Sequence, residues 1–334
     1  MSDIPPFLRS LLTRRSMLAV TLAAPLRAAG SAKAQVKYPN GPVRVILPFA
    51  AGGVADITAR LVAERLGEKL GQRFVIENMP GAGGVAAARA VLQAPADGQT
   101  LALFSNGTAI SVPLFKQLRF DPVNEFVPIS TLGTFDFLFV TAADAPYKTL
   151  GDLLKFAKAN SGLANIGTVT AGSTQNLSAE LFKASAKVDM SIVPFKATPE
   201  ILLAVTKHDI YMAIDSYASM QGLIEAGKIR ALASSGAMRG ETTPDLPTVA
   251  ESGVPGFDVT SWNAIFAQKG TPQPIIDQLN SAIRDVLREQ ELRVAFLKLG
   301  ITPIASSPAE LAMRLKSDIE KWGAVIKSAG IEQQ

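Results

Sequence analysis

Three short turns rich in glycine, serine and threonine stand where a predicted strand gives way to a predicted helix. They are Ala51-Gly52-Gly53, Pro80-Gly81-Ala82-Gly83-Gly84 and Thr170-Ala171-Gly172-Ser173-Thr174. The first turn of a helix exposes unpaired backbone N–H groups and about half a positive charge, which together suit a carboxylate or a phosphate. Glycine lets an anion approach the backbone because it has no Cβ. Each turn is a candidate anion site, although the same glycines would also serve a tight connection alone.

The middle turn has the spacing of a dinucleotide-binding fingerprint. Gly81-Ala82-Gly83-Gly84-Val85-Ala86 matches G-x-G-x-x-A after a strand. In that fingerprint the glycines follow the strand at once, whereas Asn78-Met79-Pro80 intervenes here. The next strand ends in Ser105-Asn106 and offers no acidic residue for a ribose. The sequence therefore argues against a nucleotide-dependent sensor.

Catalytic side chains are scarce. The chain has no cysteine and one histidine, His208, which excludes thiolate zinc sites, cysteine nucleophiles and histidine-rich metal sites. His208 stands before the apolar run 210–212 and reads as a turn residue that leads into a strand. A two-domain α/β enzyme with Asp56 or Asp215 as the acid/base is the alternative to a binding protein. No cofactor is predicted.

Alternating strands and helices must position these turns. The run 43–49 is β-branched and apolar, and apolar residues at 59, 62, 63, 66 and 70 then recur with helical spacing. Such alternation favours a parallel sheet covered by helices on both faces. The chain has 334 residues, enough for two lobes. The predicted strands are 43–49, 74–76, 101–104, 137–140, 164–168, 191–195, 210–214, 229–234 and 262–267. The predicted helices are 59–70, 85–93, 149–159, 174–186, 275–287 and one that begins at Ser307-Pro308.

Residues 1–34 have the pattern of an export signal. Arg14-Arg15 precedes the short apolar stretch 17–26, and small residues lead to Ala32-Lys33-Ala34, as in a twin-arginine signal peptide cleaved after Ala34. This segment holds five of the 33 basic residues and one of the 29 acidic ones, so residues 35–334 carry 28 of each. The net charge of +4 therefore belongs to the leader, and no nucleic-acid partner is expected. The predicted location is the periplasm.

Several segments in a fixed order resemble the Bug family, the extracytoplasmic solute receptors of tripartite tricarboxylate transporters. The resemblance runs from about Tyr38 to Gly330. The segments that carry it are Pro48–Asp56, Glu77–Gly84, Ala96–Leu101, Phe120-Asp121-Pro122, Ala226–Ala233, Leu246–Gly253 and Gly270-Thr271-Pro272.

The resemblance implies an α/β, two-lobed periplasmic-binding-protein fold of the type 2 (Venus-flytrap) kind. Residues 35–140 and 261–334 would form lobe 1, and residues 141–260 lobe 2. The protein would be a monomeric receptor that closes on a small carboxylate: a dicarboxylate, tricarboxylate, acidic amino acid or aromatic acid. It would serve the membrane subunits of a tripartite transporter, or sensing. The ligand carboxylate would rest on the N–H groups of the first and third turns.

The expected ligand-binding residues are drawn from the strand ends and the turns. Three of them also have a purely structural interpretation: Asp56 as a helix cap or a partner of the helix dipole, and Ser105 and Asn106 as residues that form a turn. The full set is Ala51, Gly52, Gly53, Asp56, Ser105, Asn106, Gly172, Ser173, Thr174 and Asp215.

The sequence departs from the family pattern in the middle of the chain. Gln175-Asn176 stands where a histidine is common, Phe195–Thr198 replaces a Tyr-Lys-Gly-Gly segment, and Thr206–Asp209 replaces a segment that begins Gly-Gly-Gln. These segments belong to the lobe expected to cover the distal part of the ligand. They bear on the identity of the ligand more than on the fold.

Overall fold

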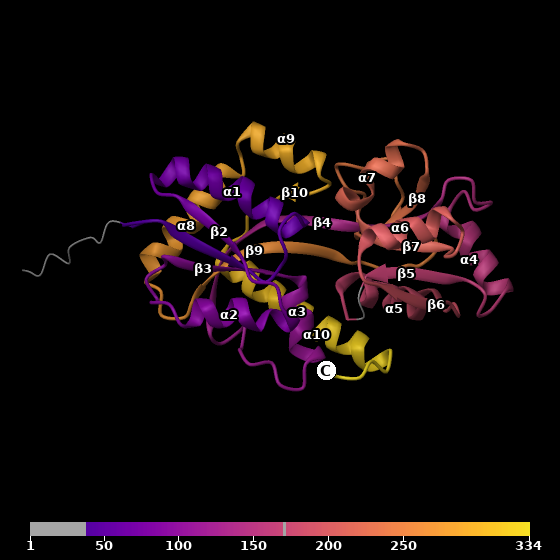
Figure 1. Ribbon diagram of the computed structural model, residues 1–334, viewed down its shortest axis with the longest axis horizontal. Helices are drawn as coiled ribbons and strands as arrows, with labels where there is room; N and C mark the ends of the chain where they lie inside the picture. The colour runs from indigo at the N-terminus through magenta and orange to yellow at the C-terminus, as the bar shows by residue number, and fades with distance from the viewer. Residues whose placement is uncertain (1–37, 170–171) are drawn as a thin grey trace, which may run out of the picture. The chain divides into compact units, whose positions relative to one another are not determined.

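Ten strands form one mixed sheet in the part of the chain that the structure, a computed structural model, describes: residues 38–169 and 172–334 (Figure 1). The sheet order is β2-β1-β3-β9-β4-β7-β5-β6, and β10 and β8 also pair with β4. These strands are β1 Val43–Leu47, β2 Phe74–Asn78, β3 Thr100–Ser105, β4 Phe126–Ala142, β5 Asn165–Val169, β6 Ser191–Phe195, β7 Met212–Ser216, β8 Ile229–Ser234, β9 Thr260–Gln268 and β10 Thr302–Pro303. The predicted signal at 1–34 and Thr170-Ala171 of the third turn lie outside the described residues.

Helices follow most of the strands, and all of these elements belong to one compact unit, Gly41–Gln334. The helices are α1 Val54–Leu70, α2 Val85–Leu92, α3 Asn106–Leu114, α4 Leu150–Ala159, α5 Thr174–Ala186, α6 Thr198–Thr206, α7 Tyr217–Glu225, α8 Gln273–Val286, α9 Gln290–Lys298 and α10 Pro308–Ser328, with a 3-10 turn, η1 Ala82–Gly84. Within the described ranges, no helix combines the length and the apolar content that a membrane crossing needs.

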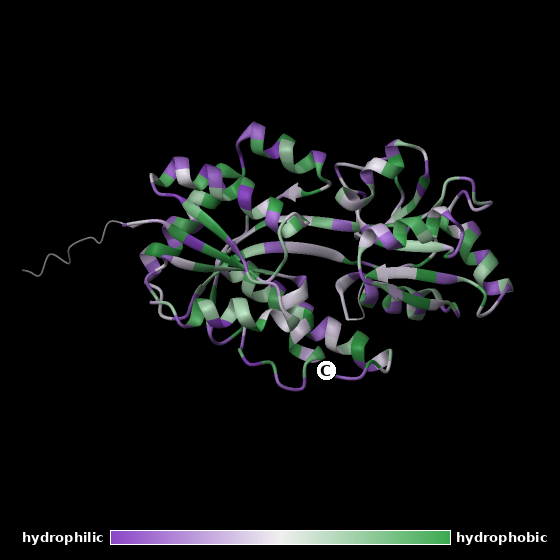
Figure 2. Cartoon of the chain, viewed as in Figure 1, coloured by the Kyte–Doolittle hydropathy of each residue, from purple (hydrophilic) through white to green (hydrophobic). Residues whose placement is uncertain are grey.

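Side-chain alternation explains how the first strands are covered on both faces. Val45 of β1 packs among apolar residues of α1 and α8, whereas its neighbour Ile46 packs with Ala87 and Ala88 of α2. Successive residues of a strand point to opposite faces, so a strand buried on both faces must be apolar throughout. Figure 2 shows these strands mostly green, while the helices around them alternate green and purple.

Two long strands, β4 and β9, run through the middle of the sheet (Figure 1). They pair with each other in antiparallel fashion from Phe126↔Gln268 to Asp136↔Thr260. Beyond that point β4 continues and pairs with β7 and β8. The sheet is therefore mixed, because β4 and β9 are antiparallel to their neighbours, whereas β1, β2 and β3, like β5, β6 and β7, are mutually parallel.

The clearest sequence patterns gave the right elements. Helix 174–186 and strands 191–195 and 229–234 have the predicted bounds. Ser307 caps α10, accepting a hydrogen bond from the Glu310 N–H, with Pro308 at the first helical position. The sequence missed α3, α6, α7 and α9, and it found only 137–140 of β4. Polar residues such as Ser130 and Thr134, together with two irregularities in the β4–β9 register, break the alternation that would have revealed that strand.

Candidate functional site

The strand register brings the carboxyl ends of β3 and β7 toward the same stretch of β4. Ser105 at the end of β3 pairs with Asn263 of β9, which pairs with Gly133 of β4. Ser216 at the end of β7 pairs with Phe137 of β4. At ~3.3 Å per residue, Gly133 and Phe137 lie about 13 Å apart along β4. The helices that follow β1, β3, β5 and β7 therefore begin around one region, where ligands bind in open α/β sheets.

The side chain of Asp56 holds the first turn, Ala51-Gly52-Gly53, in place by a hydrogen bond. Gly52 has a φ of +86°, and its N–H donates to Asp56 Oδ2 at 2.9 Å. The same carboxylate accepts Arg60 Nε and Asn78 Nδ2, each at 2.9 Å. Asp56 is the third residue of α1 and is only 3% exposed. Its carboxylate therefore fixes the turn, which agrees with the structural interpretation of Asp56 as a helix-terminus partner.

The third turn repeats this arrangement. Gly172 has a φ of +79°, and its N–H donates to Asn176 Oδ1 at 3.0 Å, four residues on, as Gly52 donates to Asp56. The Asn176 N–H is capped by Ser173 Oγ. Among the described residues, nothing accepts the N–H groups of the residues between each glycine and its partner, 53–55 and 173–175. Both helices thus present consecutive unpaired donors from a fixed turn.

The tie at Asp56 predicts a stability effect with a defined pH dependence. Burial opposes ionisation, but hydrogen bonds from Arg60, Gly52 and Asn78 outweigh it and lower the pKa of Asp56. Asp56→Asn is expected to cost about 0.5–2 kcal/mol of unfolding free energy, with a smaller effect on affinity. Because the pKa of Asp56 is lower in the folded protein, its ionised carboxylate stabilises the fold at pH values above the unfolded-state pKa of about 3.9. This contribution is lost as the pH falls through the pKa of the folded state.

Chemical denaturation of both proteins at pH 7, 5, 4 and 3 measures that dependence. The difference in unfolding free energy between wild type and Asp56→Asn should be largest at pH 7 and should narrow below about pH 4. A gap that stays constant down to pH 3 would mean that the charge of Asp56 contributes nothing.

Asn106 is held by a tryptophan from the end of the chain. Its Oδ1 accepts the Trp322 Nε1–H at 2.7 Å, and both residues are 1% exposed. The indole nitrogen can only donate, so the amide oxygen must face Trp322 and Nδ2 must face the other way. No described residue accepts from Nδ2. A buried donor without a partner costs free energy. Together with the unpaired N–H groups at the starts of α1 and α5, it favours a ligand at these strand ends.

The structural interpretation of Ser105 and Asn106 was that they form a turn, but the structure places both at the start of a helix. Ser105 is the N-cap of α3, with its Oγ accepting the Gly107 N–H at 3.0 Å, and Asn106 is the first residue of that helix. The serine hydroxyl satisfies one donor that a helix start leaves unpaired, which is why a helix forms here despite Pro113 near its end.

Asp215 is the penultimate residue of β7 and is 2% exposed. Its Oδ1 accepts the Ser216 N–H at 2.7 Å and Gln175 Nε2 at 3.2 Å, and its Oδ2 accepts a short hydrogen bond from Thr198 Oγ1. Burial raises the pKa of Asp215, and these hydrogen bonds oppose that rise. The residues that hold Asp215 begin α5 and α6, so one carboxylate links three strand ends.

The middle glycine turn is filled by the protein's own side chains. A Cβ at Gly83 would lie 3.1 Å from Leu118 Cδ1 and from Phe115 Cε2, and one at Gly84 would lie 3.2 Å from Pro48 Cβ. These glycines serve close packing. His208 stands in a turn with φ +62°, 3.2 Å from Asp144. No group of acidic residues and histidine in the described ranges has the geometry of a metal site.

Most sequence-predicted site residues therefore gather in three places: Ala51, Gly52 and Gly53 before α1, Ser105 and Asn106 at the start of α3, and Gly172, Ser173 and Thr174 with Asp215 at the ends of β5 and β7. The sequence missed four residues that hold them: Asn176, Gln175, Thr198 and Trp322. The signal for Asn176 was present, because it follows Gly172 at the spacing by which Asp56 follows Gly52.

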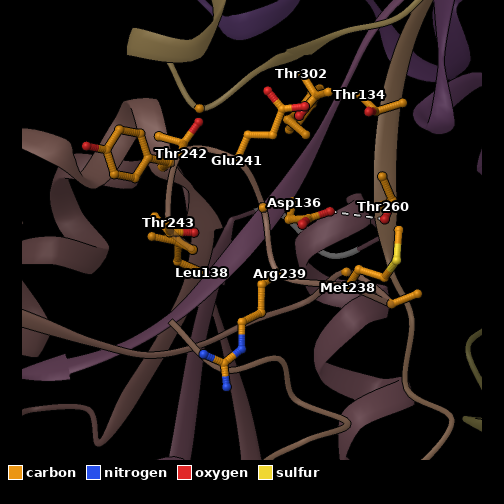
Figure 3. A pocket seen from close by; sticks show the side chains of 16 residues that line it. Thr134, Asp136, Leu138, Met238, Arg239, Glu241, Thr242, Thr243, Thr260 and Thr302 are labelled. Carbon is orange, nitrogen blue, oxygen red and sulfur yellow. Dashed lines mark hydrogen bonds between the residues drawn. The ribbon is translucent and has the colours of Figure 1, made fainter. Parts of the chain in front are cut away.

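A cavity of about 290 Å³ borders the same stretch of β4, where β4 and β9 separate, and none of the predicted site residues lines it. Figure 3 shows Asp136 inside it, hydrogen-bonded to Thr260 at 3.0 Å, with Arg239 extending away. Burial raises the pKa of Asp136 to about 6, a rise that the Thr260 hydrogen bond and Arg314 oppose and Asp258 reinforces. Arg239 is paired with Glu251 at 2.9 Å.

Comparison with known proteins finds relatives along nearly the whole chain. Residues 58–331 match the family described as the tripartite tricarboxylate transporter family receptor. Protein BugT of Bordetella pertussis is 30% identical over 295 residues, 88% of this chain and 90% of its own. The solved structure of Rpa4515 from R. palustris with adipate has a TM-score of 0.79 at 33% identity, and the match covers 88% of this chain and 99% of that one. MatC from Rhodopseudomonas palustris with bound malate has a TM-score of 0.74 at 32% identity, and the match covers 86% and 100%.

Proposed function

The chain belongs to the tripartite tricarboxylate transporter receptor family, and from that membership we propose that its strand ends capture a small carboxylate for transport or sensing. The resemblance to the Bug receptors and the periplasmic-binding-protein fold are confirmed. The protein is a periplasmic solute receptor and not an enzyme, so the acid/base alternative for Asp56 and Asp215 is set aside. The membrane subunits of a tripartite transporter are its proposed partners.

One observation carries the assignment of the site: two matched turns, each with its glycine N–H tied to a side chain and the following N–H groups unpaired. Gly52 with Asp56 and Gly172 with Asn176 form the matched pairs. The unpartnered Nδ2 of Asn106 is an independent donor at the end of β3. Two relatives at 33% and 32% identity are described with adipate and with malate, which supports a carboxylate as the ligand class.

We propose that the two lobes comprise residues 35–140 with 261–334 and residues 141–260. β4 and β9 are the strands that join them. Closing the lobes would bring the first turn and the third turn onto the same carboxylate. A ligand that binds the closed form more tightly shifts the population toward it.

A thermal-shift screen of the purified protein against a carboxylate library tests this function. A carboxylate present at about 100 times its Kd should add roughly 2.7 kcal/mol of stability. Mass spectrometry of the recovered ligand should find it unchanged. Steady formation of product would contradict the receptor assignment, and a library without any stabilising acid would contradict the ligand class.

The export route is a separate proposal, supported by Arg14-Arg15 and by Ala32-Lys33-Ala34. Replacing both arginines with lysine is expected to trap precursor in the cytoplasm, because a twin-arginine signal requires the arginine pair. Immunoblots of cytoplasmic and periplasmic fractions measure the outcome, and N-terminal sequencing of the periplasmic form should begin near Gln35. Unimpaired export of the double variant would indicate the general secretory route instead.

A further inference from the structure

The cavity where β4 and β9 separate is walled by parts of the chain that are far apart in sequence. Its lining residues belong to β4, the start of β9, the start of α7, the loop 236–243 that follows β8, and Gly300 and Thr302 at β10. Its volume of about 290 Å³ lies near the lower end of the range for ligand pockets, ~300–1,000 Å³. The cavity is therefore suited to a small molecule.

One oxygen of Asp136 in this cavity has no hydrogen-bond donor among the described residues. Asp136 Oδ1 accepts the Thr260 hydroxyl at 3.0 Å, whereas no such bond reaches Oδ2. Oδ2 lies against the loop after β8, where a Cβ at Gly236 would collide with it and a Cβ at Gly240 would lie 3.9 Å away. Gly236 therefore leaves room for the carboxylate, which Figure 3 shows inside the cavity. Oδ2 is available as an acceptor for a ligand.

Asp136 makes no ion pair with a lysine or arginine of the described residues. Arg239 belongs to the lining, but it extends away in Figure 3 and pairs with Glu251 at 2.9 Å. Arg314 of α10 acts on Asp136 only through its field, and its guanidinium donates instead to the Thr260 carbonyl at 3.0 Å. A partly buried carboxylate without a paired cation is unfavourable, so a cation that enters the cavity is stabilised by reaching it.

The ionisation state of Asp136 follows from the groups that face it. Burial raises the pKa of Asp136 to about 6, and the Thr260 hydrogen bond opposes that rise. Asp258, two residues before Thr260, reinforces the rise, and Arg314 opposes it. The other titratable groups of the lining, besides Arg239, are Glu241 from the loop after β8 and Tyr217 from α7. At pH 8, about two pH units above its pKa, Asp136 is ionised and can balance a cation.

The rest of the lining is largely apolar or carries hydroxyl groups. Apolar surface comes from Phe135, Leu138, Tyr217 and Met238, and hydroxyl groups come from Thr134, Thr243 and Thr302. Aromatic rings attract a cation over their faces, and apolar walls favour a carbon chain over water. A bare metal ion fits less well, because no group of acidic residues and histidine in the described ranges has the geometry to hold one. The lining therefore suits an organic cation.

We propose that this cavity binds a small protonated amine, with its ammonium at Asp136 Oδ2 and its carbon chain against Phe135, Leu138 and Tyr217. The ammonium donates to the oxygen that lacks a donor and supplies the cation that the carboxylate lacks. The residues proposed to hold a ligand carboxylate play no part in this site, because none of them lines the cavity. The alternative is a cavity filled with water, in which the charge of a small molecule makes no difference to its binding.

Isothermal titration at pH 8 in an amine-free buffer tests this site with butylamine, 1-butanol and methylamine. Butylamine should bind about tenfold or more tightly than 1-butanol, which has the same carbon chain and no charge, because a hydrogen bond between charged groups is the stronger one. Methylamine should bind more weakly than butylamine, because it leaves the apolar walls of the cavity uncovered.

The pH dependence of butylamine binding tests Asp136 without a substitution. An alkylammonium keeps its charge throughout, since its pKa lies near that of lysine, about 10.4. Asp136 loses its charge as the pH falls through its pKa of about 6. Wild type should therefore bind butylamine about tenfold more weakly at pH 5 than at pH 8, because about one Asp136 carboxylate in ten is ionised at pH 5. Titrations at pH 5, 6, 7 and 8 measure this loss.

Two aspartate variants connect the amine to Asp136. Asp136→Asn removes the charge at nearly constant size and should weaken butylamine binding about tenfold or more at pH 8. Asp258→Asn is the matched control, because Asp258 is exposed, accepts from the same Thr260 hydroxyl at 3.3 Å, and does not line the cavity. It makes the same change of net charge and should alter the affinity by less than about twofold. Melting curves check that both variants fold.

Each result decides for or against an amine site. Butylamine binding that exceeds that of 1-butanol, falls at pH 5 and in Asp136→Asn, and persists in Asp258→Asn supports the inference. Equal binding of butylamine and 1-butanol, no binding of butylamine, or equal affinity at pH 5 and pH 8 overturns it. Equal affinities in the two aspartate variants also overturn it. If Asp136→Asn does not fold, the pH series on wild type decides. The proposed receptor function stands in every case, because it uses other residues.

Discussion

Gly53→Asp is expected to weaken carboxylate binding at least about 100-fold while the protein stays folded. Gly53 is the N-cap of α1 with a φ of −80°, a conformation open to any residue. A Cβ built there meets nothing nearer than Ala50 O at 4.0 Å, so a side chain enters open space. An aspartate would therefore add like charge beside the N–H groups that receive the ligand, at little structural cost.

Calorimetric titration with the acid that gives the largest thermal shift, beside melting curves, measures both parts of this expectation. Gly53→Ala should lose much less affinity than Gly53→Asp, since it adds bulk without charge. Gly222→Asp is the matched control, because a Cβ at Gly222 in α7 also meets nothing within 4 Å. Unchanged affinity in folded Gly53→Asp would place the anion elsewhere and reduce the glycines to a tight turn.

Trp322→Phe is expected to lower affinity about 10- to 100-fold and to cost about 1–3 kcal/mol of stability. Removing the indole N–H leaves the buried Oδ1 of Asn106 without its donor. The amide can then rotate and present its oxygen to the ligand carboxylate, so a hydrogen bond to a charged group is lost. The effect on binding is indirect, because Trp322 positions Asn106.

Trp262→Phe is the matched control for this substitution. Trp262 is also buried, and its Nε1 donates to Asp318 Oδ2 at 2.6 Å and not to a predicted ligand residue. Both variants should melt at lower temperature, but only Trp322→Phe should lose affinity. Equal losses of affinity in the two variants would show that general destabilisation, and not the orientation of the Asn106 amide, governs binding.

The sequence predicted the helices that have both a side-chain N-cap and regularly spaced apolar residues. The helix 174–186 carries its own N-cap, Ser173, and a clean apolar face, so its bounds were correct. The helix α3 was missed because it begins with Asn-Gly and contains Pro113, although the serine that caps it, Ser105, directly precedes it in the sequence. The helix α6 lacks a side-chain cap altogether, since Ala197 precedes it.

The sequence predicted those parts of the site whose residues are neighbours in the chain. The glycine turns and the strand ends follow from sequence, because a turn and its helix are adjacent in the chain. The groups that hold them are not adjacent: Trp322 lies 216 positions from Asn106, and Asp215 lies 40 positions from Gln175. Side chains brought together by the sheet leave no trace in a single sequence.

The link between Trp322 and Asn106 also has an optical consequence. The chain has two tryptophans, and both are buried, so each should emit in the blue part of the tryptophan range. Trp322 donates to the Asn106 amide, the proposed ligand contact, whereas Trp262 donates to Asp318, one turn earlier in α10. The Trp262→Phe protein keeps Trp322 as its single tryptophan, so its fluorescence should report ligand capture through Trp322 and makes it a sensor that needs no attached dye.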